Sequence, residues 1–347
     1  RKFESSLVCT SLLPIDLIVE ENMSGNNNLE RGIVTTARVW LKVSNLSWVA
    51  GVVEEVNDTE VTINTNDGHR VKVPRGSDRI SQRTPKELEA VDNLTDLPDL
   101  DEPNLLHSLN ARYMKTKIYT RTGPILVAMN PWNNLPLYGQ EILRSYRKAN
   151  LNVVPPHIYG IGEAAFANLQ ASRKDQAILV SGDSGSGKTE STKFMMQYLA
   201  SVAHQTHTSQ TEQKVLQCNP VLEAFGNAKT RRNDNSSRFG KYIEIQFDEG
   251  LALVGAKIDT YLLEKSRVVS QEDGERNFHI FYQLTSQHGT DKLLTDAIEL
   301  KPAETFRYIS KGAAVAVGHL PATSLQNTLK ALDAIGLSAT ERLEIFK

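Results

Sequence analysis

The feature that most constrains the fold of this chain is the glycine-rich loop at Gly182–Thr189. Its sequence, Gly-Asp-Ser-Gly-Ser-Gly-Lys-Thr, matches the pattern G-x-x-x-x-G-K-[ST]. The apolar run Ala177–Val180 before it predicts a strand buried on both faces, and Thr189–Ala203 after it has helical periodicity. A second apolar run at Ile125–Met129 and a helical stretch at Glu163–Ser172 continue the alternation. This order predicts an α/β domain with a mixed, mostly parallel central sheet.

The residue types of this loop suit the binding of phosphate groups. Glycines let the backbone curl so that its N–H groups point at phosphate oxygens, and the following helix adds the positive end of its dipole. We expect Lys188 to reach the β- and γ-phosphates and the Thr189 hydroxyl to bind Mg²⁺. The predicted nucleotide-binding residues of the loop are Gly182, Asp183, Ser184, Gly185, Ser186, Gly187, Lys188 and Thr189.

The loop alone leaves the class of nucleotide-binding protein open. A chance glycine- and serine-rich turn is one alternative, and the flanking strand and helix disfavour it. A guanine-specific GTPase would carry an Asn-Lys-x-Asp motif, which the sequence lacks. A small-molecule kinase would carry a lid and a substrate site close by, and we identify neither in the sequence.

Residues 33–80 have a different pattern, in which short β-rich runs are separated by turn signals. The turns are Asn57-Asp58 and Asn66-Asp67-Gly68, and the second is typical of a β-hairpin. Strands this short and closely spaced predict a small SH3-like barrel. Trp40 and Trp48 could form an aromatic ligand patch, but aromatic side chains are mostly buried for packing, so we assign both to the core. The predicted strands are Val39–Leu41, Trp48–Val53, Val61–Ile63 and Val71–Val73.

The remaining segments divide around these two regions. We expect residues 1–32 to be a disordered or artefactual extension, with a native start at Met23. Residues 81–103 are predicted to form a linker, because three prolines and several aspartates interrupt any hydrophobic periodicity. Residues 104–347 then form the α/β domain.

The end of the chain and its composition narrow the class of protein. Ser338 and Glu341 predict a capping box for a helix that has only begun at Lys347, so we expect a fragment. The formal net charge of −2 gives no electrostatic basis for a nucleic-acid partner. Two cysteines are too few for a disulfide framework and favour a reducing, intracellular setting. No apolar run approaches the roughly eighteen residues of a membrane span, so we expect no direct membrane insertion.

A second polar loop, Arg231–Lys241, precedes the alternating run Tyr242–Phe247, which predicts a strand. Taken alone, its composition is that of a solvated surface loop. Together with the phosphate loop it has another meaning, because adjacent serines and an asparagine suit a loop that senses a γ-phosphate and Mg²⁺.

At this point several motifs, in order along the chain, closely resemble the myosin family. Asn130-Pro131 with Tyr138 looks like the adenine-binding loop of the family, Gly182–Thr189 like its phosphate loop and Asn233–Gly240 like its first switch. The resemblance runs from about Val39 to the last residue. Three further segments are family-like: Asn219–Thr230, Leu262–Val268 and Glu275–Tyr282.

The resemblance implies which residues would hold the adenine and the metal. Asn130, Pro131 and Tyr138 would line the adenine pocket, and Thr189 and Ser237 would coordinate Mg²⁺. Asn133 and Asn134 stand where many members have a basic residue near the adenine, which would weaken nucleotide affinity.

It also implies which residues would act on the phosphates. Lys188 and the loop backbone would hold them, Asn233 would contact phosphate, and Ser236 would lie beside the γ-phosphate and the attacking water. Arg238 would pair with a glutamate of the second switch, which lies beyond this sequence, so we expect Arg238 to have no partner within this chain. Asp183 and Ser186 replace the usual Glu and Ala of the phosphate loop, and the backbone cradle should tolerate both.

The function implied by the resemblance is that of an actin-based motor. The complete protein would hydrolyse ATP to ADP and phosphate, move on actin filaments, bind light chains or calmodulin, and work in the cytoplasm with the cytoskeleton. Because the second switch and main actin-binding region are missing, this fragment alone is expected to be inactive or weakly active. The alternatives are a truncated ATP-binding protein without hydrolysis and another P-loop ATPase or kinase.

Three other features suggest structural roles. His204 and His207 lack the further ligands of a metal site and fit an exposed loop. His279 lies in an aromatic stretch and is predicted to be a core histidine. Met195 and Met196 are predicted to lie on the buried face of a helix.

Overall fold

The computed structural model describes residues 5–10, 33–44, 47–84, 90–203, 209–287, 296–315 and 324–347. The chain forms two compact units. The first comprises Arg1–Leu12, Leu143–Lys148 and Ile161–Lys347, and the second comprises Leu13–Ile142 and Ala149–Gly160. Among the described residues, no helix is both long and apolar enough to cross a membrane.

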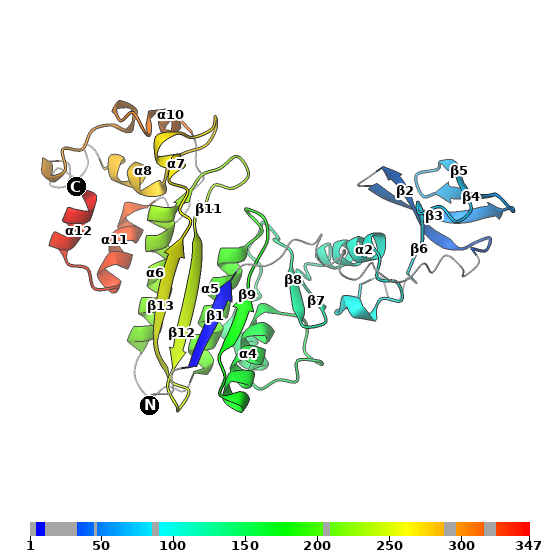
Figure 1. Ribbon diagram of the computed structural model, residues 1–347, viewed down its shortest axis with the longest axis horizontal. Helices are drawn as coiled ribbons and strands as arrows, with labels where there is room; N and C mark the ends of the chain where they lie inside the picture. Colours follow the sequence, from blue (N-terminus) through cyan, green and yellow to red (C-terminus); the bar gives the residue numbers. More distant parts are fainter. Residues whose placement is uncertain are drawn as a thin grey trace. The chain divides into compact units, whose positions relative to one another are not determined.

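The second unit contains a five-stranded antiparallel sheet in the order β5-β4-β3-β2-β6, consistent with the predicted SH3-like part (Figure 1). Its core is made of aliphatic side chains from all five strands. Buried and exposed residues alternate in the middle of β3, whereas consecutive residues are buried in β2 and β4. The strands are β2 (Arg38–Ser44), β3 (Ser47–Val56), β4 (Glu60–Thr65), β5 (Arg70–Pro74) and β6 (Ile80–Gln82).

The predicted hairpin turn lies between β4 and β5. Gly68 has a φ of 88°, a left-handed conformation that favours glycine. The N–H of Gly68 donates to the carbonyl of Thr65 at 2.9 Å, and the N–H of Thr65 donates to the carbonyl of His69 at 2.8 Å. The earlier turn is also present, because the side chain of Asn57 accepts hydrogen bonds from the backbone N–H groups of Thr59 and Glu60.

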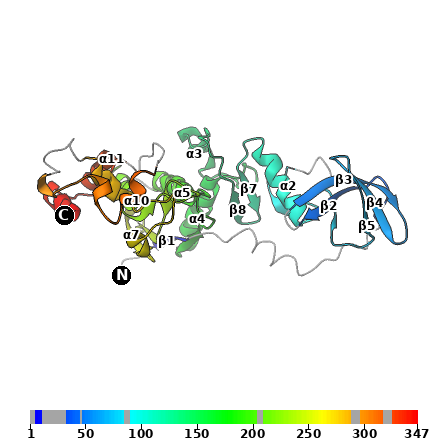
Figure 2. The ribbon, with the colours of Figure 1, turned by 90° about the horizontal axis from the view of Figure 1, so that it is seen from above.

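The two tryptophans attach this sheet to helix α2 (Glu102–Tyr113), which lies beside it in both ribbon views (Figure 1, Figure 2). Trp40 is buried, and its indole N–H donates to Oδ1 of Asn104 at 2.9 Å. The half-buried Trp48 donates to Oε2 of Glu102 at 3.1 Å. The core position predicted for Trp40 is confirmed, whereas Trp48 is only half-buried. Each indole N–H donates to a side chain of the helix.

The other apolar run of this unit is not a strand of a central sheet. The short strands β7 (Tyr119–Thr122) and β8 (Ile125–Ala128) form a two-stranded antiparallel hairpin, and β7 also makes a single bridge from Arg121 to Asn93. The prediction of a strand buried on both faces at Ile125–Met129 is therefore wrong. Ile125 is largely exposed, and Leu126 is the buried member of the run. The 3-10 helix η3 (Leu94–Asp96) precedes α2, and α3 (Gln140–Tyr146) follows the hairpin.

The first unit is built on a four-stranded sheet in the order β13-β12-β1-β9 (Figure 1). The strands are β1 (Ser5–Thr10), β9 (Gln176–Leu179), β12 (Gly240–Phe247) and β13 (Leu253–Tyr261). Only β1 and β9 are parallel, whereas β1–β12 and β12–β13 are antiparallel. In the described part of the chain the sheet is mixed, as predicted, but not mostly parallel.

Strand β1 also differs from the expected disordered or artefactual extension over 1–32. Residues 5–10, Ser-Ser-Leu-Val-Cys-Thr, form this strand between β9 and β12. Its apolar and β-branched residues suit a strand that pairs on both edges. The other residues of that extension, up to residue 32, lie outside the described part.

Helices accompany this sheet. Helices α4 (Ile158–Ser172) and α5 (Lys188–Val202) match the predicted stretches, and Met195 and Met196 are buried on α5 as expected. Helix α6 (Ser209–Gly226) runs along β13, and α8 (His279–Thr285) and α11 (Leu325–Ala334) pack against α6 (Figure 1). The capping box of Ser338 and Glu341 is present at α12 (Ala339–Phe346). The remaining short elements are β10 (Asn227–Ala228), β11 (Ser236–Ser237), α7 (Ser266–Val269), η4 (Ala303–Thr305) and α10 (Ser310–Ala313).

Candidate phosphate-binding site

The loop that joins β9 to α5 has the backbone that its glycines predict. Gly182, Gly185 and Gly187 have φ angles of 140°, 85° and 97°. Residues with a Cβ rarely adopt these values, so the path of the loop depends on glycine. Gly187 occupies the N-cap position of α5, and the positive end of the helix dipole is therefore directed at the loop.

Lys188 folds back across this loop. Its Nζ donates to the carbonyl oxygens of Gly182 at 2.5 Å and Asp183 at 2.9 Å. Burial lowers the pKa of Lys188 from its ordinary value, and the negative charge of Asp183 opposes part of that change. The ammonium group is thus held over the loop by neutral acceptors, where an anion would stabilise its charge.

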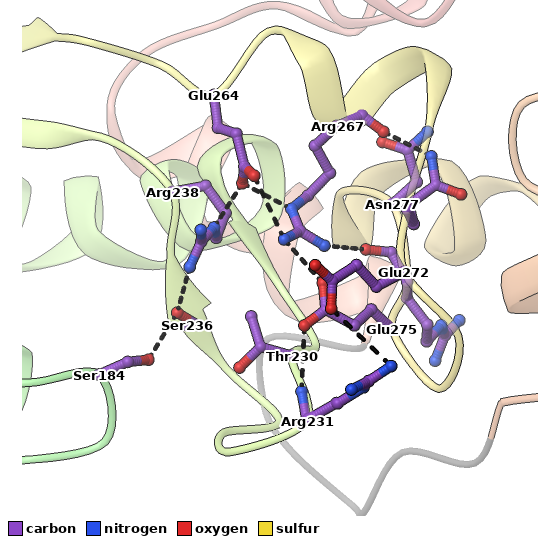
Figure 3. A network of polar contacts seen from close by, with 12 residues as sticks. Ser184, Thr230, Arg231, Ser236, Arg238, Glu264, Arg267, Glu272, Glu275 and Asn277 are labelled. Atoms are coloured by element: carbon purple, nitrogen blue, oxygen red, sulfur yellow. Dashed lines mark hydrogen bonds and ion pairs between the residues drawn. The ribbon is translucent and has the colours of Figure 1, made fainter.

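The second polar loop lies against the phosphate loop. Strand β11 pairs with β10, which places Ser236 where its Oγ is 2.8 Å from the Oγ of Ser184 (Figure 3). Ser236 is buried, at 2% exposure, whereas the neighbouring Ser237 is exposed. The structure therefore brings together the two loops that the sequence placed some fifty residues apart.

The two residues predicted to bind the metal line one cavity of about 200 Å³. Thr189 lies at the start of α5, Ser237 lies in β11, and Lys188 borders the same cavity. Hydroxyl oxygens are ligands that suit Mg²⁺. Within the described ranges, no group of three or more His, Cys, Asp or Glu side chains could hold a metal ion, so such an ion here would also need phosphate oxygens. The residues present fit Mg²⁺ that arrives with a nucleotide.

Asn233 shapes its own loop. Its carbonyl accepts hydrogen bonds from the N–H of Thr230 at 2.8 Å and from the Thr230 hydroxyl at 3.2 Å. Its side-chain Oδ1 accepts from the N–H of Asn235 at 3.0 Å. In the structure the side-chain oxygen of Asn233 is thus used inside the turn, and the predicted phosphate contact stays a prediction.

Arg238 has a partner within this chain, contrary to expectation. Its Nε donates to Oε2 of Glu264 at 2.6 Å, and its Nη1 donates to the Oγ of Ser236 at 3.0 Å. The backbone supports the same contact, because the N–H of Glu264 donates to the carbonyl of Arg238 at 2.9 Å. Glu264 could not be predicted as this partner, because the chain passes along β12 and β13 before it returns to the loop and no local spacing reveals such a contact.

The predicted adenine residues all lie in the second unit. The side chain of Asn130 accepts a hydrogen bond from the N–H of Trp132 at 2.9 Å. The hydroxyl of Tyr138 is 2.8 Å from the hydroxyl of Tyr119. The backbone carbonyl of Tyr138 accepts a hydrogen bond from the hydroxyl of Tyr159 at 3.1 Å. Pro131 is half-buried beside Asn130. These residues belong to a different compact unit from the phosphate loop.

Asn235, on the second polar loop, is a further residue that was not predicted as part of the site, and it contacts His279 of α8. His279 is buried, as predicted, but its Nε2 lies 3.1 Å from Oδ1 of Asn235. Asn235 in turn donates to Oε2 of Glu223 at 3.1 Å, and Glu223 pairs with Lys193 of α5 at 2.9 Å. These polar contacts link the loop to α5, α6 and α8. His204 and His207 lie outside the described residues.

Comparison with known proteins places these motifs in a family. A model of the myosin head (motor domain) family matches residues 91–347. The Myosin-J heavy chain of Dictyostelium discoideum is 40% identical over 90% of this chain and 15% of the relative. Myosin-7 of Arabidopsis thaliana is 42% identical over 91% of this chain and 18% of the relative. Myosin-2 of Lachancea kluyveri is 38% identical over 89% of this chain and 21% of the relative. The chain therefore spans about a fifth or less of the length of these curated relatives.

Proposed function

Because this chain belongs to the myosin motor-domain family, we propose that it binds MgATP at Gly182–Thr189 as the nucleotide-binding part of an actin-based motor. The observation that carries the proposal is the contact between the two polar loops, Ser184 Oγ to Ser236 Oγ at 2.8 Å. This contact supports a second loop that would lie beside the γ-phosphate of a nucleotide bound in the first loop. A loop held by a γ-phosphate and released after hydrolysis is a known way to drive a conformational change.

The residues of the phosphate loop would bind the nucleotide in a defined way. The N–H groups around the three positive-φ glycines would donate to phosphate oxygens. Lys188 would exchange its two carbonyl acceptors for the β- and γ-phosphates, and the anion would raise its lowered pKa. Mg²⁺, when bound with the nucleotide, would neutralise phosphate charge, and the hydroxyls of Thr189 and Ser237 would hold it.

The second loop would contribute to phosphoryl transfer. Ser236 would lie beside the γ-phosphate and orient the attacking water, and Asn233 would contact phosphate. Arg238 already donates to the Ser236 hydroxyl and would add positive charge at the same place. Positioning and charge stabilisation are most of what phosphoryl transfer requires of a protein. Asn130, Pro131 and Tyr138 are the residues that we propose for the adenine.

The remaining proposals concern the complete protein. It would hydrolyse ATP to ADP and phosphate, move on actin filaments, carry light chains or calmodulin and act in the cytoplasm with the cytoskeleton. Family membership and the relatives' myosin names support this function. The 347-residue chain by itself is proposed to bind MgATP with little or no hydrolysis.

Titration of the purified chain with the fluorescent analogue mant-ATP, with and without Mg²⁺, tests this proposal. We expect the Lys188→Ala variant to bind at least tenfold more weakly, because a charge-assisted hydrogen bond to phosphate is worth roughly 1.5–3 kcal/mol. Thr189→Ala should reduce binding only when Mg²⁺ is present. The matched control is Lys301→Ala, since Lys301 is exposed and distant in sequence from both loops. Equal affinities of wild type and Lys188→Ala would refute the site.

A further inference from the structure

One carboxylate lies between two arginines next to the proposed site. Oε2 of Glu264 accepts from Nε of Arg238 at 2.6 Å and from Nε of Arg267 at 2.7 Å (Figure 3). Both guanidinium groups thus donate a hydrogen bond to the same carboxylate oxygen. Arg238 belongs to the second polar loop, whereas Arg267 belongs to α7, so Glu264 joins these two elements.

The side of this contact away from the loop is firmly held. Arg267 is only 5% exposed. Its Nη2 lies 2.9 Å from Oε2 of Glu275, and its Nη1 donates to the carbonyl of Arg276 at 3.0 Å. Glu275 also accepts from the backbone N–H of Arg231, at 3.3 Å. Two carboxylates therefore balance the charges of two arginines, and Arg267 is fixed in one orientation.

The side toward the loop leads directly to the phosphates. Arg238 donates to Ser236 at 3.0 Å, and Ser236 is 2.8 Å from Ser184 in the phosphate loop. An arginine side chain has several rotatable bonds and would lose its direction without a second fixed contact. For Arg238, the hydrogen bond from Nε to Glu264 is this second fixed contact, and it leaves Nη1 directed at Ser236.

Glu264 is suited to hold two cations at once. Burial alone would raise the pKa of Glu264, but the hydrogen bonds and the positive charges of Arg238 and Arg267 together outweigh this and keep the pKa below its ordinary value. The carboxylate thus remains charged at neutral pH. A carboxylate shared by two guanidinium groups gives strong, directional, charge-assisted hydrogen bonds.

We propose that Glu264 is a positioning residue, which directs Arg238 at Ser236 and, by pairing with Arg267 as well, anchors the second polar loop to α7. The proposal rests on the proposed function at the phosphate loop. Glu264 is not among the residues proposed to hold the nucleotide or the metal, so it would act on the phosphates through Arg238. Two consequences distinguish it from a purely structural ion pair: the loop should loosen locally without Glu264, and the effect should require Arg238.

Hydrogen exchange in the chain without nucleotide tests the first consequence. In Glu264→Gln we expect the amides of Arg238 and Glu264 to exchange about tenfold faster, because both donate in the backbone contacts that accompany this pair. Glu249→Gln is the matched control, since Glu249 is exposed in the turn between β12 and β13. Unchanged exchange at these two amides would overturn the proposal. Glu264→Asp, which keeps the charge on a shorter side chain, should give an intermediate increase and serves if Glu264→Gln fails to fold.

Release of mant-ATP tests the second consequence. We expect Glu264→Gln and Arg238→Gln each to release the analogue about tenfold faster, and the double variant to release it no faster than Arg238→Gln alone. Effects that multiply in the double variant would overturn the proposal, because Glu264 would then act by another route. If the wild-type chain does not bind mant-ATP, the proposed function fails, and the hydrogen-exchange result still decides the role of Glu264.

Discussion

At Gly182 the backbone has a φ of 140°, and an added Cβ would lie 2.5 Å from the Oγ of Ser186. A side chain here would meet both a strained backbone and a close neighbour. The hydroxyl oxygen of Ser186 is itself buried. The sequence therefore has no freedom at position 182 if the loop is to keep its path.

The first prediction at this scale concerns Gly182→Ala. We expect it to lower the free energy of unfolding by roughly 1–3 kcal/mol, the cost of a strained backbone conformation, and to weaken mant-ATP binding. Gly255→Ala is the control, because a Cβ there would meet only the end of Gln246 at 3.4 Å and the backbone is extended. Urea unfolding and titration of both variants check the prediction, which fails if the two variants behave alike.

At the scale of single elements, a buried arginine fastens three segments of the second unit. Arg112 of α2 is 2% exposed and donates to the carbonyl of Tyr119 at 2.6 Å and to the hydroxyl of Thr120 at 2.8 Å. It also pairs with Asp92, whose side chain is 55% exposed. The helix, the hairpin and the segment before η3 therefore share one cation.

The unequal burial of this pair leads to a prediction. Arg112→Met should destabilise the second unit by about 2 kcal/mol, because two buried acceptors on β7 lose their donor. Asp92→Asn should cost under about 1 kcal/mol, because water solvates the exposed carboxylate and screens the pair. Urea unfolding followed by the fluorescence of Trp40 and Trp48 measures both variants. Equal losses in the free energy of unfolding would show that the buried contacts of Arg112 with β7 do not dominate the stability that this pair provides.

Elements that depend on neighbouring residues were predictable from the sequence. The hairpin at Gly68 and the capping box at Ser338 each follow from a few adjacent residues, and both are present. Elements that depend on distant partners were not. The run at Ile125 is as apolar as a central strand, yet its partner is the adjacent β7, and nothing local decides between these outcomes. The phosphate loop was predictable because its pattern consists of adjacent residues. The contact of Arg238 with Glu264 was not, because it joins residues that are distant in the sequence.

At the scale of the whole molecule, buried titratable groups couple stability to pH. Burial, followed by the positive charge of Arg276, lowers the pKa of His279 to about 4 from its ordinary 6.5. The folded state thus binds this proton less readily than the unfolded chain does. The stability that the neutral ring provides is complete above about pH 6.5 and is lost as the pH falls toward 4.

We therefore expect the step from about pH 7.5 to about pH 5 to cost the wild type roughly 2 kcal/mol through this one residue. His279→Gln, which can still donate to Asn235, should lose correspondingly less stability over the same step. His69→Gln is the control, since His69 is exposed in a hairpin turn. Urea unfolding of the three proteins at both pH values provides the measurement, and parallel losses in all three would contradict the assignment.

The place of β1 in the sheet has a consequence for how the chain is made. Ser5 pairs with Phe247, and Leu7 pairs with Gln176, so the earliest described residues lie between strands that come much later in the sequence. Pairing over such separations is slow, because the entropy of closing the loop is lost before the contacts form. On the ribosome, residues 5–10 must wait until both neighbouring strands have emerged, so this sheet cannot close before synthesis has passed Phe247.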